Sequence, residues 1–255
     1  MKQLTKTDFI LYRECPKNVW IKWHIPEDYN KFEISEFERS LGVMGNEVEE
    51  LARGMFPGGF LVERSNEGAQ ELTKKLIGDK TLVIFQAVFS TDKYLTATDV
   101  LKWNPEANAY DLYEIKMSST EEDDDDEEED DGKPKKVNKK KELQYEYDLA
   151  FQANVLKECG VPIHDKYLIR LNKKYVRLGN LDFSENKLFI KENKTEVIDK
   201  LMETAQTEML DAYKYLSQTE MPEGPCLCYF RGRSSHCTSF SVSNPNVPKY
   251  SVHDL

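Results

Sequence analysis

Apolar residues in the first third of the chain recur at the spacing of an α-helix. A helix is expected over residues 37–54, because the apolar residues in this stretch and at its end come at intervals of three and four: Leu41, Met44, Val48, Leu51, Ala52 and Met55. Such spacing puts them on one helical face, and the segment Phe56–Gly59 would end the helix. Thr5 or Thr7 would cap an earlier short helix, and a third helix is expected over residues 67–77.

The pattern then changes to short apolar runs that are typical of strands. Three such runs cover residues 81–89, 94–103 and 109–117. Residues 104–108, with the sequence NPEAN, favour a turn between the second run and the third. We therefore expect a hairpin or meander whose later strands carry acidic residues.

The second half of the chain alternates between helical and strand patterns. A helix is expected over residues 142–158, strands over residues 167–172 and 188–190, and a long amphipathic helix over residues 195–216. After Pro222 the sequence is irregular and rich in Cys, Pro and Ser. Helices, a small mixed sheet and a closing helix predict an α/β domain over residues 1–220, with the mixed β-sheet flanked by helices.

Charge is concentrated between the third strand and the next helix. Residues 121–131 are eleven consecutive acids, and six lysines follow within residues 133–141. Because so charged a segment buries too little apolar surface to fold, residues 118–141 are expected to be a disordered insertion. The whole chain carries a net charge of -11, and Arg170 with residues 173–177 comes closest to a DNA-binding patch. A divalent ion would have to supply part of the charge that binds phosphate.

The same pattern bears on where the protein acts. No stretch approaches the roughly 20 apolar residues that a membrane span needs, and the first residues lack the pattern of a secretory signal. We therefore expect a cytoplasmic protein with no membrane partner. In a reducing compartment the five cysteines are expected to be thiols or metal ligands rather than disulfides.

Two acids and a lysine occupy strand positions that can converge. Because side chains alternate along a strand, Glu114 and Lys116 share one face and Ile115 points to the other. The turn would bring Asp99, on the preceding strand, alongside Glu114. Two carboxylates near the backbone carbonyl of Ile115 would form an oxygen site for Mg²⁺ or Mn²⁺, where Lys116 can hold or activate a water because its pKa falls easily in a crowded site. The alternative is an ordinary cross-strand charge pair on a solvated face.

The segment VFSTDKYLTATDVLKWNPEANAYDLYEIKMSS resembles the core hairpin of RecB-like nucleases of the PD-(D/E)xK superfamily. This resemblance implies a restriction-endonuclease-like core in which Asp99 and Glu114 ligate metal and Lys116 organises the nucleophile. The helix sequence YEYDLAFQANVLKECG resembles the family's Gln and Tyr motif, which implies that Tyr147 and Gln152 position phosphate or water. An ordinary polar helix position is the alternative for Gln152.

The segments GNEVEELARGMFPGG and YLIRLNKKYVRLGNLD are similar to a bacterial branch of these nucleases, which is related to the CRISPR-associated RecB-like exonucleases. Many RecB-like nucleases carry a metal-binding His one turn after a helix glycine, and the matching position after Gly45 is Val48 here. Glu47 or Glu50 would have to replace that ligand, and Glu47 is preferred. The departure puts the number of metal ions, and activity itself, in question.

Four cysteines are arranged as one early and three late residues: Cys15, Cys226, Cys228 and Cys237. The layout resembles that of RecB-like exonucleases, and the resemblance implies a four-iron four-sulfur (4Fe-4S) cluster that packs the C-terminal tail on the N-terminal helix. The late spacing differs from the common one, so structural Zn²⁺, with His236 in place of one sulfur, and unrelated thiols stay as alternatives. Cys159 is expected to be a core thiol.

These patterns together favour a metal-dependent DNA nuclease. Residues 1–220 would form the nuclease-like domain, and residues 221–255 a Cys-rich segment that completes the cluster site with Cys15. The expected reaction is exonucleolytic hydrolysis of single strands or duplex ends by a metal-activated water. The first alternative is a non-catalytic module, held together by an iron–sulfur cluster or zinc, that binds nucleic acid or a protein partner. The second is a scaffold with no role on nucleic acid.

Overall fold

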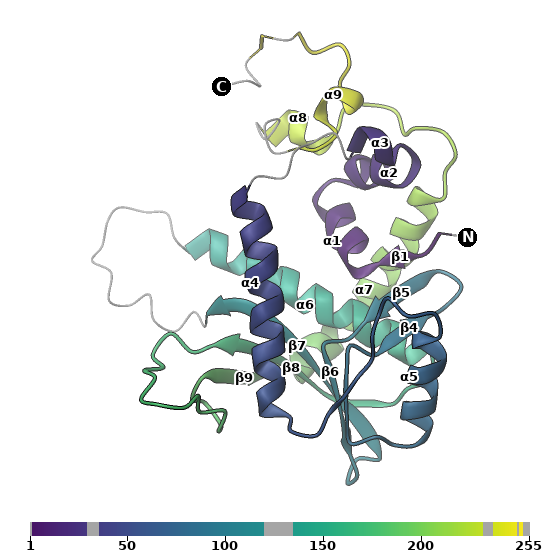
Figure 1. The fold of residues 1–255 in the computed structure, drawn as a ribbon. Coiled ribbons are helices and arrows are strands. Elements are labelled where there is room, and N and C mark those ends of the chain that lie inside the picture. The colour runs from purple at the N-terminus through teal and green to yellow at the C-terminus, as the bar shows by residue number, and fades with distance from the viewer. Residues whose placement is uncertain (1, 30–35, 120–134, 232–236, 249, 252–255) are drawn as a thin grey trace.

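A computed structural model describes residues 2–29, 36–119, 135–231, 237–248 and 250–251 of the chain. The fold is mixed α/β, with two β-sheets flanked by helices (Figure 1). The expected α/β class, with a mixed sheet between helices, is therefore confirmed. In the described part of the chain, no helix is long and apolar enough to cross a membrane.

The larger sheet has six strands and mixes parallel with antiparallel pairing. Its order is β2 (Phe60–Leu61), β3 (Val83–Phe85), β6 (Val100–Asn104), β7 (Ala109–Ser119), β8 (Ile163–Leu171) and β9 (Phe189–Asn193). Strands β3, β6 and β7 are successively antiparallel, β8 lies parallel to β7, and β9 returns antiparallel to β8. The β6–β7 hairpin closes where Asn104 pairs with Ala109, so the expected turn is present.

The smaller sheet shares one two-stranded ribbon with the larger sheet. Its order is β1 (Leu4–Thr5), β5 (Tyr94–Ala97) and β4 (Val88–Ser90). The ribbon stays hydrogen-bonded where it turns from one sheet into the other, because Gln86 N donates to Asp99 O at 3.1 Å and Thr98 N donates to Ala87 O at 2.9 Å. Gln86 adopts a positive φ of 54° there. The two continuous strands expected over residues 81–89 and 94–103 are therefore each divided at this corner.

Helices cover both faces of the larger sheet. Helices α1 (Lys6–Glu14), α6 (Lys135–Glu158) and α7 (Thr195–Leu216) pack on one face, and α4 (Glu36–Ala52), which ends in the short helix η1 (Arg53–Met55), crosses the other (Figure 1). Along β7, Leu112 belongs to the core beneath α6, whereas Tyr113 and Ile115 belong to the core beneath α4. This alternation turns Glu114 and Lys116 toward α6. Helix α5 (Ala69–Gly78) packs against β4.

Thr5 caps the N-terminus of α1. It is therefore Thr5, of the two residues expected to cap this helix, that does so. Thr5 and Asp8 form a capping box, in which each side chain bonds the other residue's backbone N–H. Helix α2 (Pro16–His24) follows directly after Cys15 and leads into α3 (Pro26–Tyr29). The late helices α8 (Leu227–Arg231) and α9 (Phe240–Ser243) lie beside α2 (Figure 1). Asn18 Oδ1 accepts a hydrogen bond from Thr238 Oγ1 at 2.9 Å, so distant ends of the sequence meet here.

Three details of the expected elements differ in the structure. Met44, placed on the buried stripe of α4, is 49% exposed, because the buried side of this helix is confined to its last turns. Strand β7 continues to Ser119 and α6 begins at Lys135, so the edges of the expected insertion belong to regular elements. Residues 120–134, the rest of that insertion, lie outside the described residues.

Candidate active site and cysteine cluster

Asp99 is placed by the corner of the bent ribbon. It lies between the end of β5 and the start of β6, and its Oδ2 accepts a hydrogen bond from Ile115 N at 2.8 Å. This bond ties the Asp99 carboxylate to β7, next to Glu114. Only 8% of Asp99 is exposed, so its charge is largely removed from water.

Glu114 is the centre of a buried network of charged and polar groups. Its Oε1 accepts hydrogen bonds from Lys6 Nζ at 2.6 Å and Lys116 Nζ at 2.7 Å. Its Oε2 accepts one from Gln152 Nε2 at 2.7 Å. The structure therefore brings together the expected residues Glu114, Lys116 and Gln152, with Asp99 beside them.

Lys116 is held by a second carboxylate on α6. Its Nζ lies 2.5 Å from Asp148 Oδ2 and 5.0 Å from the centre of the Tyr145 ring. Asp148 and Gln152 are one turn apart on this helix, so they reach the same face of the sheet. Lys116 thus lies between two carboxylates and above an aromatic ring, an arrangement that favours its charged form.

Burial and mutual charges shift the pKa values of the central groups. Burial, and then the charge of Glu114, raises the pKa of Asp99 to about 7. Burial alone would raise the pKa of Glu114, but the ammonium groups of Lys116 and Lys6 hold it well below its usual value. Burial alone would lower the pKa of Lys116, yet Glu114 and Asp148 hold it above its usual value. The expected fall in the lysine pKa is therefore wrong for this arrangement, because two carboxylates outweigh burial.

Tyr147 lies away from this network. Its hydroxyl donates to Glu208 Oε1 on α7 at 3.0 Å, and its ring packs against Phe9. Tyr145 takes the place beside Lys116 instead. The tyrosine expected to position the substrate is thus part of the core between α6 and α7, and the tyrosine next to the site is two residues earlier.

Glu47 is exposed on α4, whereas Glu49 of the same helix contacts residues of the site. Glu49 Oε1 accepts a hydrogen bond from Gln86 Nε2 at 2.7 Å. Arg64 links Glu49 to the site, because its Nη2 lies 3.9 Å from Glu49 Oε1 and 3.8 Å from Asp99 Oδ1. Val48 packs in the core beneath α4, so this position supplies no ligand.

Lys6 and Asp148 are central to the site and were missed from the sequence. Asp148 had a usable signal, because it precedes the candidate Gln152 by one helical turn. Lys6 had none, because it belongs to a different helix and lies far from Glu114 along the chain. The packing of α1 against α6 is what brings it there.

Two observations bear on whether a divalent ion fits. Asp99 keeps a raised pKa because its burial is only partly compensated, and Gln152 Oε1 is buried with no hydrogen-bond partner among the described residues. Both are oxygen ligands of the kind that Mg²⁺ and Mn²⁺ prefer, so the residues fit such an ion. The backbone N–H of Ile115 is used by Asp99, and the Ile115 side chain is buried on the opposite face.

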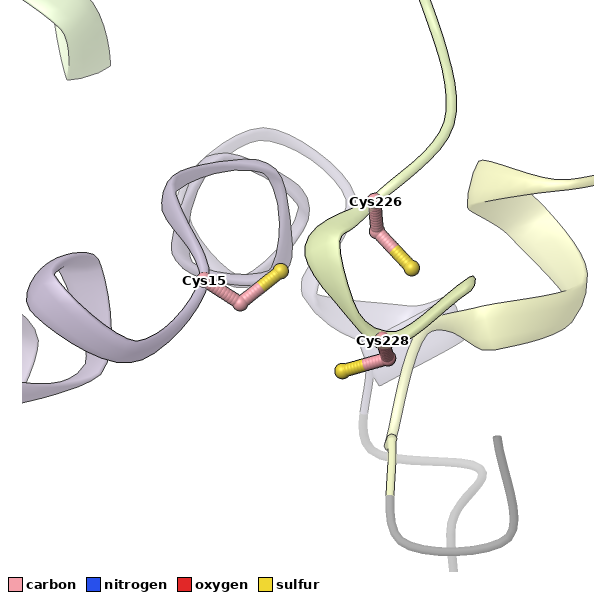
Figure 2. A group of neighbouring side chains, drawn as sticks. All are labelled: Cys15, Cys226 and Cys228. Carbon is pink, nitrogen blue, oxygen red and sulfur yellow. The ribbon is translucent and has the colours of Figure 1, made fainter. Parts of the chain in front are cut away.

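A second group of possible metal ligands consists of cysteines. The sulfur atoms of Cys15, Cys226 and Cys228 all lie within 4.8 Å of one another. Figure 2 shows Cys15 coming from the junction of two N-terminal helices, while Cys226 and Cys228 come from the C-terminal segment. Cys237 is also buried in this cluster. The four cysteines singled out from the sequence therefore meet in space.

Hydrogen bonds within this cysteine cluster shift the pKa values of its thiols in opposite directions. Bonds from the thiols of Cys15 and Cys237 hold the pKa of Cys226 far below that of a free thiol. The same bonds to Cys226, with burial, hold the pKa values of Cys15 and Cys237 above theirs. Asn244 Nδ2 also lies 3.3 Å from Cys226 Sγ. A thiolate that accepts such bonds is a ready metal ligand, so the donor set fits either an iron–sulfur cluster or Zn²⁺.

Three further expectations concern side chains outside these two sites. Cys159 is exposed and its sulfur lies 3.7 Å from Ser90 O. The prediction that Cys159 is a core thiol is therefore wrong, because this residue follows the end of α6, where the chain is exposed. Arg170, expected in a basic surface patch, is 3% exposed and pairs with Glu142 on α6. His236, the alternative ligand, lies outside the described residues. All five cysteines are free.

Comparison with models of known protein families finds no match. Comparison with curated proteins finds no match either.

Proposed function

We propose that the chain is a nuclease that depends on Mg²⁺ or Mn²⁺ and hydrolyses phosphodiester bonds of DNA. The observation that carries the proposal is the convergence of Asp99, Glu114 and Lys116 at the corner of the ribbon. The order of elements supports it as well: the β6–β7 hairpin, helix α6 and the parallel strand β8 suit the restriction-endonuclease-like core that the resemblance implies.

Each residue has a role that follows from its contacts. Asp99 and Glu114 would hold the divalent ion, which supplies a water of lowered pKa and positive charge for the phosphate. Lys116, which carries a proton in this arrangement, would orient that water or stabilise charge on the phosphate. Gln152 fixes Glu114 through its amide N–H group and offers its buried carbonyl oxygen to a water.

The cysteine cluster would have a structural role in the same protein. Cys15, Cys226, Cys228 and Cys237 would hold a four-iron four-sulfur cluster or Zn²⁺, and either would join the C-terminal segment to the N-terminal helices. The absorption spectrum of anaerobically purified protein distinguishes the two. Iron–sulfur centres absorb broadly near about 400 nm, whereas Zn²⁺ is colourless because its d-shell is filled.

Two specific observations favour a second function, a module that binds nucleic acid or a protein partner without cutting. Two ammonium groups already bond Glu114 Oε1, and Val48 stands where many related nucleases have a histidine. Both features reduce the ligands open to a divalent ion. Binding of labelled DNA without cleavage would favour this module.

The direct test is Mn²⁺-dependent degradation of end-labelled single-stranded and duplex DNA, with RNA as a further substrate. We expect cleavage of DNA and a fall of at least about a hundredfold in Lys116→Met, because one preorganised positive group at the reacting phosphate is lost. Lys166→Met is the matched control, since Lys166 is also a strand lysine held in an ion pair, here at 2.7 Å from Asp199, and it is at least as buried as Lys116. Equal rates in the two variants, or no cleavage by the unmodified chain, would contradict the proposal.

A further inference from the structure

Two ammonium groups saturate one oxygen of Glu114. Lys6 Nζ and Lys116 Nζ both donate to Oε1, at 2.6 and 2.7 Å. A carboxylate oxygen accepts about two hydrogen bonds through its lone pairs. A divalent ion that binds Oε1 must therefore displace one of the two lysines.

The two lysines are not held equally. Lys116 also bonds Asp148 and lies over the ring of Tyr145. Among the described residues, the ion pair that Lys6 makes is with Glu114. Displacing Lys6 therefore costs one ion pair, whereas displacing Lys116 leaves Asp148 short of its own partner. Lys6 is the group that an incoming cation would replace.

The fold nevertheless fixes the position of Lys6 beside Glu114, because Lys6 lies on a helix that is held at both ends. It is the first residue of α1, directly after the cap Thr5. The capping residue Asp8 is in turn held by Lys22 of α2, at 2.7 Å. Cys15, in the cysteine cluster, follows the other end of α1. Both ends of the helix are thus fixed, and the ammonium group is preorganised beside Glu114.

We propose that Lys6 competes with the divalent ion: its ammonium group occupies the cation position at Glu114, and metal binding displaces it. This inference rests on the proposed function for the identity of the ion. It makes α1 an element that restrains the site, because a cation must overcome the Lys6–Glu114 contact before it can bind. The side chain of Lys6 is 23% exposed, so the displaced ammonium group can move toward water.

The first test measures the affinity of the full chain for Mn²⁺ without DNA, from the electron paramagnetic resonance signal of free Mn²⁺. We expect Lys6→Met to bind Mn²⁺ about tenfold more tightly than the unmodified chain, the effect of one lost charge-assisted hydrogen bond. Lys6→Arg, which keeps the charge, should bind like the unmodified chain. Lys166→Met is the matched control, because Lys166 forms a 2.7 Å ion pair with Asp199, away from Glu114 and α1. Unchanged or weaker binding by Lys6→Met, or equal tightening in the control, would overturn the inference.

The second test uses the unmodified chain, so it does not depend on the folding of a variant. Acylation of each lysine amine is followed by mass spectrometry with and without saturating Mn²⁺. Labelling of Lys6 should rise when Mn²⁺ binds, while labelling of Lys22 stays constant. If Lys6 is labelled equally under both conditions, the ion does not displace it and the inference fails.

The two proposals fail in different ways. Tighter Mn²⁺ binding by Lys6→Met without any cleavage of DNA would support the competition and contradict the nuclease. Cleavage by the unmodified chain with equal Mn²⁺ affinity in Lys6→Met would support the nuclease and contradict the competition.

Discussion

The carboxylate–lysine site and the cysteine cluster are both assembled from distant segments, but their charges are balanced differently. Around Glu114, two ammonium groups meet the carboxylates of Glu114 and Asp148. In the cysteine cluster, by contrast, the hydrogen-bond partners of Cys226 are other thiols and the amide of Asn244. The first site is therefore held by the protein's own opposite charges, whereas the second needs an external cation to hold more than one thiolate.

This difference predicts where each site is vulnerable. A site balanced by internal ion pairs loses stability when one partner is removed, because the other charges stay buried. A site completed by a metal loses the metal itself, and with it the binding free energy that contributes to folding.

The largest effect is expected in the cysteine cluster. Cys226→Ser removes the sulfur that contacts both Cys15 and Cys237. The iron or zinc that we propose for this cluster should then be lost, and the midpoint of thermal unfolding should fall by something on the order of 10 °C. Metal analysis and calorimetry measure both. Cys159→Ser is the matched control, because Cys159 is exposed and should change neither. Full metal content in Cys226→Ser would remove the distinction between the two sites.

The next largest effect concerns Glu114. Glu114→Ala leaves Lys6, Lys116 and Gln152 without their shared acceptor, so the free energy of unfolding should fall by about 3 to 5 kcal/mol. Urea denaturation measures this. Glu196→Ala is the control, since Glu196 is 84% exposed in its pair with Lys200 and should change stability by less than about 0.5 kcal/mol. Similar losses in both variants would mean that the charges around Glu114 do not depend on it for their stability in the folded chain.

A smaller, pH-dependent effect is expected at Asp99. Its pKa is raised from 3.8 to about 7 in the folded chain, so between these values the folded state binds a proton that the unfolded state has released. Stability therefore falls as pH rises through this window. Without added metal, the unmodified chain should lose about 2 to 3 kcal/mol relative to Asp99→Asn between pH 5 and pH 8. Parallel stability curves for the two chains would show that Asp99 ionises normally, and Mn²⁺ should reduce the loss because it binds the ionised form.

Much of the fold followed from local patterns. Alternation along β7 placed Glu114 and Lys116 on one face and Ile115 on the other, as the structure has them. Helical spacing found the later helices, whereas the cysteine cluster was implied by the resemblance in cysteine layout and not by a local pattern. Alternation and helical spacing depend on neighbours in sequence, where the period of an element decides which side chains point together.

The remainder depends on tertiary packing. Lys6 reaches Glu114 because α1 packs against α6, and nothing near Lys6 in the sequence reports this. Tyr147 is the residue that the resemblance implies, and a resemblance in sequence does not give the phase of α6 relative to the sheet. Tyr147 lies five positions from Gln152, about 140° around the helix, whereas Tyr145 lies seven positions away and returns to nearly the same face. Glu47 and Glu49 are likewise two positions apart on α4, so they point to different sides of that helix.

The corner where the ribbon passes between the sheets has a mechanical consequence. Asp99 sits on this corner, across from the left-handed backbone of Gln86, and its carboxylate is held by the backbone N–H of Ile115. A ligand that binds this carboxylate therefore acts on the backbone corner that joins the two sheets. Occupancy of that one group can therefore stiffen the whole β scaffold, and amide hydrogen exchange at residues 86–88 and 98–100 would report on it.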